Sequence, residues 1–297
     1  MRRLPPAKAA VAAGILGNSI FGLSFLFSKI ALAHMAPLPF LSLRFLVAFL
    51  FMTLLLLLRV FSIDWKKPGK WKLLALGLFQ PVLYFPLESY GILYTNASFS
   101  AVMIALVPIT SMIYGALFLQ EFPSRRQVCA ASLSILGIVL LSLEQESAGA
   151  IRPLGIVILL GAVLAATGFN VLSKETGRQF TAFERTYGMF FLGSAVFTAA
   201  AAGTEGGFAY LRAALETPDV LLSVAYLGII SSVVAFLCLN YANQHLPLAR
   251  AASFANLATV LPVLAGVLIL HEPFSPMMVP AALLVLAGIW GVQKKEV

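Results

Sequence analysis

The sequence predicts an all-α polytopic membrane protein with ten transmembrane helices, arranged as two inverted five-helix repeats. Of its 297 residues, 60% are hydrophobic and 11% are charged, so the chain cannot cover a water-soluble surface and requires a bilayer as its solvent. Its apolar segments are continuous rather than alternating, which disfavours a transmembrane β-barrel. The same residue pattern occurs twice, and an odd number of spans per copy inserts the second copy upside down.

The repeat emerges when the first half of the chain is shifted onto the second. At a shift of 151 residues the matched pairs are Gly77 with Gly228, Tyr90 with Tyr241, Gly115 with Gly266, Glu121 with Glu272, Ser124 with Ser275 and Gly137 with Gly288. Nearer the start the shift is 145, and Lys29 then meets Lys174. Inverted repeats are the architecture of alternating-access transporters, so this pattern favours solute transport.

Each expected helix is an apolar segment near the length of about 20 residues that crosses a bilayer. The expected helices are residues 9–33, 39–60, 71–94, 97–119, 126–143, 153–173, 183–202, 219–243, 249–270 and 276–293. Nine or ten spans fit the hydropathy, and the repeat symmetry favours ten. The expected organisation is a cytoplasmic N-terminus at 1–8, a first repeat at 9–143, a linker at 144–152, a second repeat at 153–293 and a cytoplasmic C-terminus at 294–297.

Basic residues are distributed unevenly between the two ends of these helices. Sixteen of the 20 Lys and Arg residues fall on one side of the ten-helix arrangement, whereas Arg152 and Arg212 fall on the other. Lys29 and Arg44 lie within helices. Because positive residues stay cytoplasmic, we expect both termini inside a bacterial-type inner (plasma) membrane. The net charge of +8 is therefore a topology signal, and nucleic acid is not an expected partner.

Polar residues within the spans are the candidates for binding a solute, because such groups are costly in hydrocarbon. Gln80, Tyr84 and Glu88 follow one another at intervals of four residues, which predicts one stripe on one helix face. Glu88 is the one acid placed in the interior of a span. It serves either as the partner of Lys29 or Arg44 in a buried ion pair, or as a proton site or ligand for a substrate ammonium.

Further candidates recur at helical spacing in other segments. Amides and hydroxyls can coordinate the amino and carboxyl groups of a zwitterion, and they also bond helices to one another. Tyrosine can stack on an aromatic or cationic ligand or simply pack. The remaining substrate-binding candidates are Asn18, Ser19, Tyr114, Asn170, Asn256 and Thr259.

Charged residues near the helix ends form a third group, with roles in charge pairing or gating. Lys29 and Lys174 are interpreted as repeat partners, and so are Arg44 and Arg185. These cations reach headgroups, cap helix C-termini or act in a gate. Glu121 and Glu272 end two spans, where they orient loops, pair with basic residues or act in a gate.

Signatures of catalysis are absent from the sequence. The three histidines do not cluster, and no His-Glu metal spacing, glycine-rich phosphate loop or serine nucleophile motif occurs. We therefore expect no catalytic residue, no metal, no cofactor and no enzyme activity.

The order and duplication of several short motifs resemble the drug/metabolite transporter superfamily, of the EamA type, over nearly the whole chain. The residues that carry the resemblance are Phe21 to Phe25, Lys29, Arg44, Phe45, Tyr90 to Ser98, Pro108 and Leu119 to Glu121, and then Lys174, Arg185, Tyr241, Ala242 and Leu270 to Glu272. The resemblance implies ten helices, inverted five-helix repeats, a central cavity, and export or exchange of small metabolites, often amino acids.

Taken together, the sequence predicts a transporter that exports or exchanges small metabolites by alternating access, with amino acids as the favoured class and Glu88 as the candidate proton-coupling residue. An amine or drug exporter and a passive facilitator of the same fold are the alternatives. The expected partners are a small-molecule substrate and the lipid bilayer. A complete set of ten helices suggests that a monomer suffices.

Overall fold

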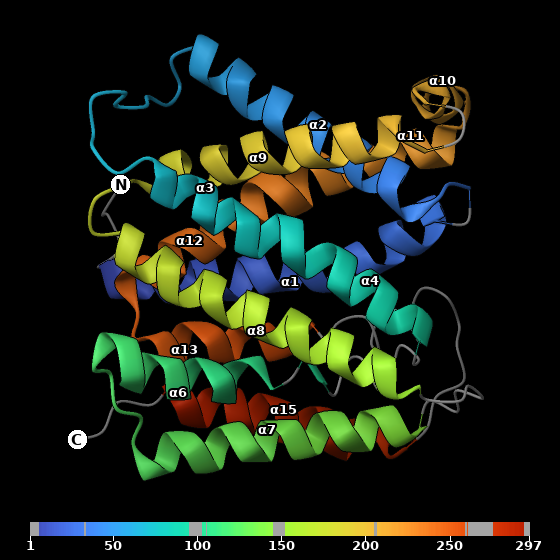
Figure 1. The fold of residues 1–297 in the computed structure, drawn as a ribbon. Helices are drawn as coiled ribbons and strands as arrows, with labels where there is room; N and C mark the ends of the chain where they lie inside the picture. The colour runs from blue at the N-terminus through green and yellow to red at the C-terminus, as the bar shows by residue number, and fades with distance from the viewer. Residues whose placement is uncertain are drawn as a thin grey trace.

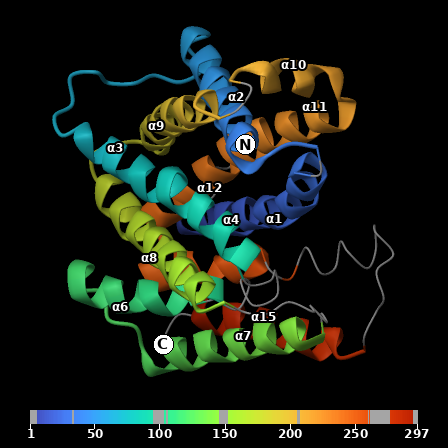
Figure 2. The same cartoon turned by 45° about the vertical axis from the view of Figure 1, so that its right-hand side comes forward.

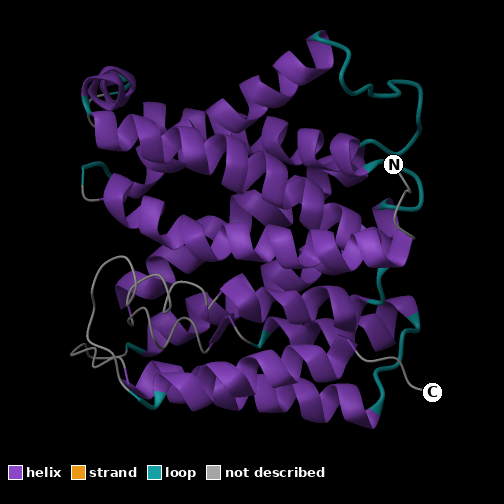
Figure 3. Cartoon of the chain, turned by 180° about the vertical axis from the view of Figure 1, so that it is seen from behind, coloured by secondary structure: helices purple, strands orange, loops and turns teal. Residues whose placement is uncertain are grey.

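The computed structural model describes residues 6–32, 34–94, 103–104, 106–144, 152–204, 207–258, 260 and 276–293. These residues form helices, turns and loops and no strand (Figure 3). The helices long and apolar enough to cross a bilayer are Ala7–Ser24, Pro37–Leu57, Pro153–Thr176 and Pro218–His245, with two shorter apolar helices at Val107–Leu119 and Val279–Val292. The predicted all-α class with apolar spans is confirmed.

The described helices follow the expected segments closely. They are α1 (Pro6–Leu32), α2 (Pro37–Leu57), α3 (Trp71–Gly77), η1 (Leu78–Leu83), α4 (Tyr84–Tyr94), α6 (Val107–Leu119), α7 (Arg125–Glu144), α8 (Pro153–Thr176), α9 (Ala182–Ala202), α10 (Ala209–Glu216), α11 (Pro218–Ala225), η2 (Tyr226–Val234), α12 (Ala235–His245), α13 (Leu248–Ser253), η3 (Phe254–Asn256) and α15 (Met278–Gln293). The short amphipathic α10 was not expected from the sequence. Residues 97–102 and 261–270 of two expected spans lie outside the described residues.

Helix starts follow from local chemistry. Pro37, Pro153 and Pro218 occupy first helical positions, where a missing N–H costs nothing. At α9, the Oγ1 of Thr181 accepts from the backbone N–H of Glu184, and the Glu184 carboxylate accepts from the backbone N–H of Thr181. This capping box satisfies two amide donors that would otherwise lack partners.

Two expected spans contain a wide π-helical segment near their middle. η1 joins α3 to α4, and η2 joins α11 to α12. Within η1 the backbone of Gln80 is extended, with φ −148° and ψ 118°. The prediction that Gln80, Tyr84 and Glu88 form one continuous helical stripe is therefore wrong at Gln80, because the regular spacing of four residues holds only in an unbroken α-helix.

The long helices lie side by side with roughly parallel or antiparallel axes (Figure 1). α2 packs against α9, α1 against α12, and α4 against α8, while α7 and α15 form a tight pair at one edge of the molecule. The α7–α15 pair stays together in the view turned by 45° (Figure 2). Large apolar side chains such as Leu117, Val157 and Trp290 are exposed on the outside, as expected for a surface that faces lipid.

Glycines determine how closely α7 and α15 approach, and they do so reciprocally. A Cβ atom added at Gly137 would lie 2.6 Å from the carbonyl oxygen of Ala281, and one added at Gly288 would lie 2.6 Å from that of Ala130. Ala281 and Gly288 follow Ala130 and Gly137 by 151 residues, the shift at which the sequence repeats. Because the later residue of each helix meets the earlier residue of the other, the two helices run antiparallel.

A second pair of glycines makes matching contacts, one where α3 meets α9 and the other where η2 meets α2. A Cβ atom at Gly77 would lie 3.0 Å from the Cα of Met189, and one at Gly228 would lie 3.1 Å from the carbonyl oxygen of Arg44. Gly77 and Gly228 are separated by 151 residues, and Arg44 and Met189 by 145. These contacts pair Arg44 with Met189, so Arg185 lies one helical turn before the position that corresponds to Arg44.

Candidate functional site

The acid predicted within a span, Glu88, lies half-buried on α4 and is bonded to its own helix. The hydroxyl of Tyr84 donates to Glu88 Oε1 over 2.7 Å, as the spacing of four residues predicts. Glu88 makes no ion pair with Arg44, and the side chain of Lys29 lies outside the described residues. Gln80, four residues before Tyr84 in the sequence, is buried within η1.

Arg44 is buried at the junction of α2, α4 and η2. Its Nε donates to the hydroxyl of Ser232 and its Nη2 to the hydroxyl of Ser231, each over 3.0 Å. Ser24 of α1 donates to Ser231 over 2.6 Å. The guanidinium carbon lies 4.8 Å from the centre of the Phe85 ring, close enough for a cation–π contact. The site thus joins a cation to aromatic and hydroxyl groups from both halves of the chain.

Arg185 is also fully buried, but it is saturated with hydrogen bonds. Its Nη1 donates to the carbonyl and hydroxyl oxygens of Ser173, its Nη2 to the Asn240 carbonyl and to Gln244 Oε1, and its Nε to the Thr181 carbonyl. These partners lie at the end of α8, just before α9 and on α12. Arg185 therefore ties three helices together.

A second polar cluster joins α6, α8 and α12. The Nδ2 of Asn170 donates to the Ser111 hydroxyl over 3.4 Å, and the Nδ2 of Asn243 donates to Asn170 Oδ1 over 3.2 Å. Asn243 Oδ1 is buried and has no partner among the described residues. Reversing both amide groups would leave the Nδ2 of Asn243 unpaired instead. This series of hydrogen bonds therefore ends in a polar group that a water or solute could satisfy.

The other predicted binding residues are less suited to contact a solute. Asn18 donates to the Gly14 carbonyl of its own helix over 2.9 Å, and Asn256 donates to Ser134 of α7 over 2.7 Å. Ser19 is half-buried on α1, and the Tyr114 ring packs at 5.4 Å from that of Phe118. The geometry thus gives the two asparagines structural bonds. Thr259 and Glu272 lie outside the described residues.

Lys174 and Glu121 form an ion pair between the end of α8 and the turn after α6. Lys174 Nζ lies 2.9 Å from Glu121 Oε1 and also donates to the Leu246 carbonyl. Glu121 Oε2 accepts from the backbone N–H of Leu248, over 2.7 Å. The pair therefore fastens α6, α8 and the start of α13 at one end of the bundle.

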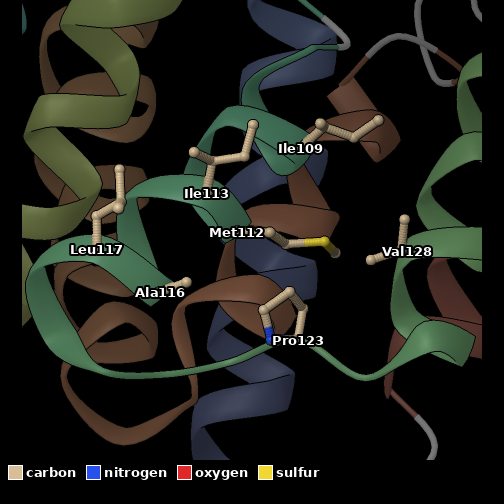
Figure 4. Close-up of a pocket in the computed structure, with 7 residues that line it drawn as sticks. All are labelled: Ile109, Met112, Ile113, Ala116, Leu117, Pro123 and Val128. Carbon is tan, nitrogen blue, oxygen red and sulfur yellow. The ribbon is translucent and has the colours of Figure 1, made fainter.

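Two cavities lie beside this end. The larger, of about 420 Å³, opens between α6 and α7 (Figure 4). It is lined by Ile109, Met112, Ile113, Ala116, Leu117, Pro123 and Val128, so it presents no side chain that could bind a polar solute. The smaller, of about 30 Å³, includes Ser111 and Glu121 in its lining and has room for about one water.

Several of these residues were missed by the sequence analysis. Phe85 gave no signal, since phenylalanine is common in an apolar span, and Ser24 was noted only as part of the family resemblance. Asn243 is the last residue of the predicted span 219–243 and Gln244 follows it, a place where polar side chains are ordinary. Within the described residues, no group of three His, Cys, Asp or Glu could hold a metal ion.

Comparison with known proteins identifies this arrangement. The EamA-like transporter family matches residues 8–143 and again residues 153–293. The chain belongs to the EamA-like transporter family. The predicted resemblance to the EamA type of the drug/metabolite transporter superfamily is therefore confirmed, and the protein is a multi-pass membrane transporter.

Relatives of this EamA-like protein occur in bacteria and archaea. It is 30% identical over 292 residues to the uncharacterized transporter YcxC of Bacillus subtilis, covering 95% of this chain and 92% of the relative. It is 27% identical over 282 residues to an uncharacterized transporter of Archaeoglobus fulgidus, covering 94% and 96%. A protein of known crystal structure superposes with a TM-score of 0.83 over 96% of both chains at 16% identity, which supports the fold alone.

Proposed function

We propose that this protein exports or exchanges small metabolites across an inner membrane by alternating access between two inverted five-helix repeats. Amino acids are the favoured solutes. In this mechanism ten helices span the membrane, residues 9–143 and 153–293 form the two repeats, and their rocking exposes a central site to either side. A single chain carries both repeats.

The reciprocal glycine contacts carry this proposal. A two-fold axis that relates two antiparallel helices is perpendicular to them, and therefore lies in the plane of the membrane that they cross. The contacts of Gly137 with Ala281 and of Gly288 with Ala130 have this relation. It is the symmetry expected of an inverted repeat, in which each half can adopt the conformation of the other.

The position of the polar groups supports a site between the halves. Arg44 and Glu88 belong to the first half, whereas Ser231 and Ser232 belong to the second. Their counterparts under the two shifts are apolar, because Glu88 corresponds to Leu239 and Arg44 to Met189. Buried ionisable residues mark solute and proton pathways in membrane proteins, so these unmatched groups support a site at this place.

Cytoplasmic termini are supported by the clustering of basic loops. Lys67 with Glu184, Lys72 with Glu175, and Lys174 with Glu121 form ion pairs. These pairs lie around the start of α3, the end of α8 and the start of α9, at the end of the bundle where α1 starts and α15 finishes (Figure 1). The positive-inside rule assigns that end to the cytoplasm.

Counterflow in proteoliposomes tests this function. A panel of labelled amino acids would be exchanged by the wild type and by Glu88→Gln over a series of pH values, with the half-exposed Glu175→Gln as the matched control. We expect saturable exchange of one class by the wild type and the control. We expect Glu88→Gln to lose the pH dependence of exchange, because glutamine cannot carry the proton.

Each alternative has its own outcome. Flux that never saturates would indicate a passive facilitator. Exchange of amines without exchange of amino acids would indicate an amine or drug exporter. A Glu88→Gln variant with the pH dependence of the wild type would return Glu88 to a structural role.

A further inference from the structure

The two buried arginines differ in how many of their donors are used. A guanidinium has five N–H groups. Arg185 donates through all three of its nitrogens, and three of its acceptors are backbone carbonyls. Arg44 donates only to the hydroxyls of Ser231 and Ser232, and its Nη1 bonds to no described residue. All three side-chain nitrogens of Arg185 are therefore hydrogen-bonded within the protein, whereas the Nη1 of Arg44 is not.

The unused nitrogen of Arg44 is not completely covered by the protein. Within the described part of the chain, Asn243 Oδ1 is the one side-chain nitrogen or oxygen atom that is fully shielded from solvent and has no hydrogen-bond partner. The Nη1 of Arg44 also lacks a partner. Because it is not fully shielded in this way, part of its surface is left uncovered. Arg44 as a whole is only 3% exposed, so the uncovered area is small and the side chain is otherwise buried.

The charge of Arg44 also lacks a bonded counter-ion. None of the carboxylates in the described residues forms an ion pair with it. Glu88 interacts with Arg44 electrostatically, yet its carboxylate accepts its hydrogen bond from the hydroxyl of Tyr84. A cation and an anion that interact without forming an ion pair offer separate partners to a ligand that carries both charges.

The rings beside Arg44 define the remainder of the ligand. Phe85 precedes Glu88 by three residues on α4, and its ring lies 4.8 Å from the guanidinium carbon of Arg44. That ring packs at 5.4 Å from Phe45 and at 5.3 Å from Tyr84. Phe27 of α1 stacks on Tyr226 of η2 at 4.0 Å. These aromatic rings favour a ligand with an apolar or aromatic side chain over a ligand with a charged one.

We propose that Arg44 binds the carboxylate of a zwitterionic amino acid whose ammonium is received by Glu88, and that the aromatic walls select an apolar or aromatic side chain. The Nη1 and the free Nη2 hydrogen offer the parallel donors that a carboxylate accepts. The hydroxyls of Ser231 and Ser232 hold the guanidinium in place. This inference rests on the proposed transport function and names the substrate class of its central site.

Competition against exchange of labelled L-phenylalanine and L-leucine tests the inference on the wild type alone. The competitors are each amino acid, its methyl ester, and the amine that lacks the carboxylate, 2-phenylethylamine or 3-methylbutylamine. We expect the ester and the amine to compete at least about tenfold more weakly than the amino acid, the effect of losing one hydrogen bond to a charged group.

Variants locate the effect at Arg44. Arg44→Gln should lose the preference for the amino acid over its ester and amine, and Arg44→Lys should keep part of it, because lysine retains the charge without the paired donors. The exposed Arg212→Gln is the matched control and should behave as the wild type. Ser232→Ala, which removes one hydroxyl beneath the guanidinium, provides a milder variant if Arg44→Gln fails to fold.

The outcomes separate this inference from the proposed function. Equal competition by amino acid, ester and amine in the wild type would overturn it while leaving a transporter. An unchanged preference in a folded Arg44→Gln would overturn it as well. Absence of exchange for every compound would instead reject the proposed function on which it rests.

Discussion

The α7–α15 interface and the region around Arg44 hold the two halves together in opposite ways. In the first, glycines bring backbone against backbone, and the contacts of one half are copied in the other. In the second, a cation, serine hydroxyls and phenylalanine rings meet. The ring of Phe85 recurs at the shifted position as Phe236, but Arg44 corresponds to Met189 and Ser231 to Gln80. The difference teaches that close packing serves the architecture of both halves, whereas the cation of the polar centre belongs to one of them.

Substitution of the interface glycines should have the largest effect. Gly137→Val and Gly288→Val each place side-chain atoms against a carbonyl that already lies 2.6 Å from a Cβ position. Overpacking of this kind costs about 1–3 kcal/mol or more. We expect both variants to lower the unfolding temperature in detergent by similar amounts, because the contacts are reciprocal.

The control for these variants is Gly203→Ala, whose new methyl group would meet its nearest neighbour at an ordinary 3.5 Å. It should unfold at nearly the temperature of the wild type. If Gly137→Val and Gly288→Val were as stable as this control, backbone contact could not be the feature that holds α7 to α15.

Substitution of Arg185, whose side-chain nitrogens all donate hydrogen bonds, should have the second-largest effect on stability. Arg185→Gln removes up to five hydrogen bonds between α8, α9 and α12. At roughly 0.6 kcal/mol per bond within a membrane protein, we expect a loss of about 2–3 kcal/mol in the free energy of unfolding. Denaturation in mixed micelles measures it.

The comparison with Arg44 is sharpened by the selectivity of the same variant. Arg185→Gln should leave the relative competition by amino acid, ester and amine unchanged in the protein that still folds. A shift in that selectivity would show that Arg185 contacts the solute, and the distinction between the two arginines would then be lost.

The ion pair of Lys174 with Glu121 should contribute least. In a double-mutant cycle with Lys174→Gln and Glu121→Gln, we expect a coupling of about 1 kcal/mol, at the upper end of the range for pairs that water can reach. The more exposed pair of Lys72 and Glu175, at 3.3 Å, is the control and should give about 0.3 kcal/mol. Equal coupling energies in the two pairs would show that the ion pair of Lys174 and Glu121 holds α6, α8 and α13 together no more strongly than an ordinary surface pair.

The helices were predictable because the length of an apolar segment is a local property of the sequence. The bounds of α3 through α4 and of α9 were reproduced closely for this reason. The bond between Tyr84 and Glu88 was also predictable, since helical spacing decides which side chains meet. The wide turn at Gln80 was not, because it depends on how the helix packs rather than on its composition.

The site around Arg44 was only partly visible in the sequence for a different reason. Arg44 itself was singled out as a cation in an apolar span, but its serine partners lie 187 and 188 residues further along the chain. No local pattern links residues at that separation. The unpaired oxygen of Asn243 was equally hidden, because a buried atom without a partner is a property of the folded structure.

The reciprocal packing of α7 and α15 also limits how far the two halves of the chain can change in sequence. Gly137 and Gly288 each lie against the other's helix, so a bulkier residue at either position disturbs the same interface. A substitution in one half is therefore felt by the other half as well. The two halves are freer to differ away from this interface, as they do at Arg44 and Glu88.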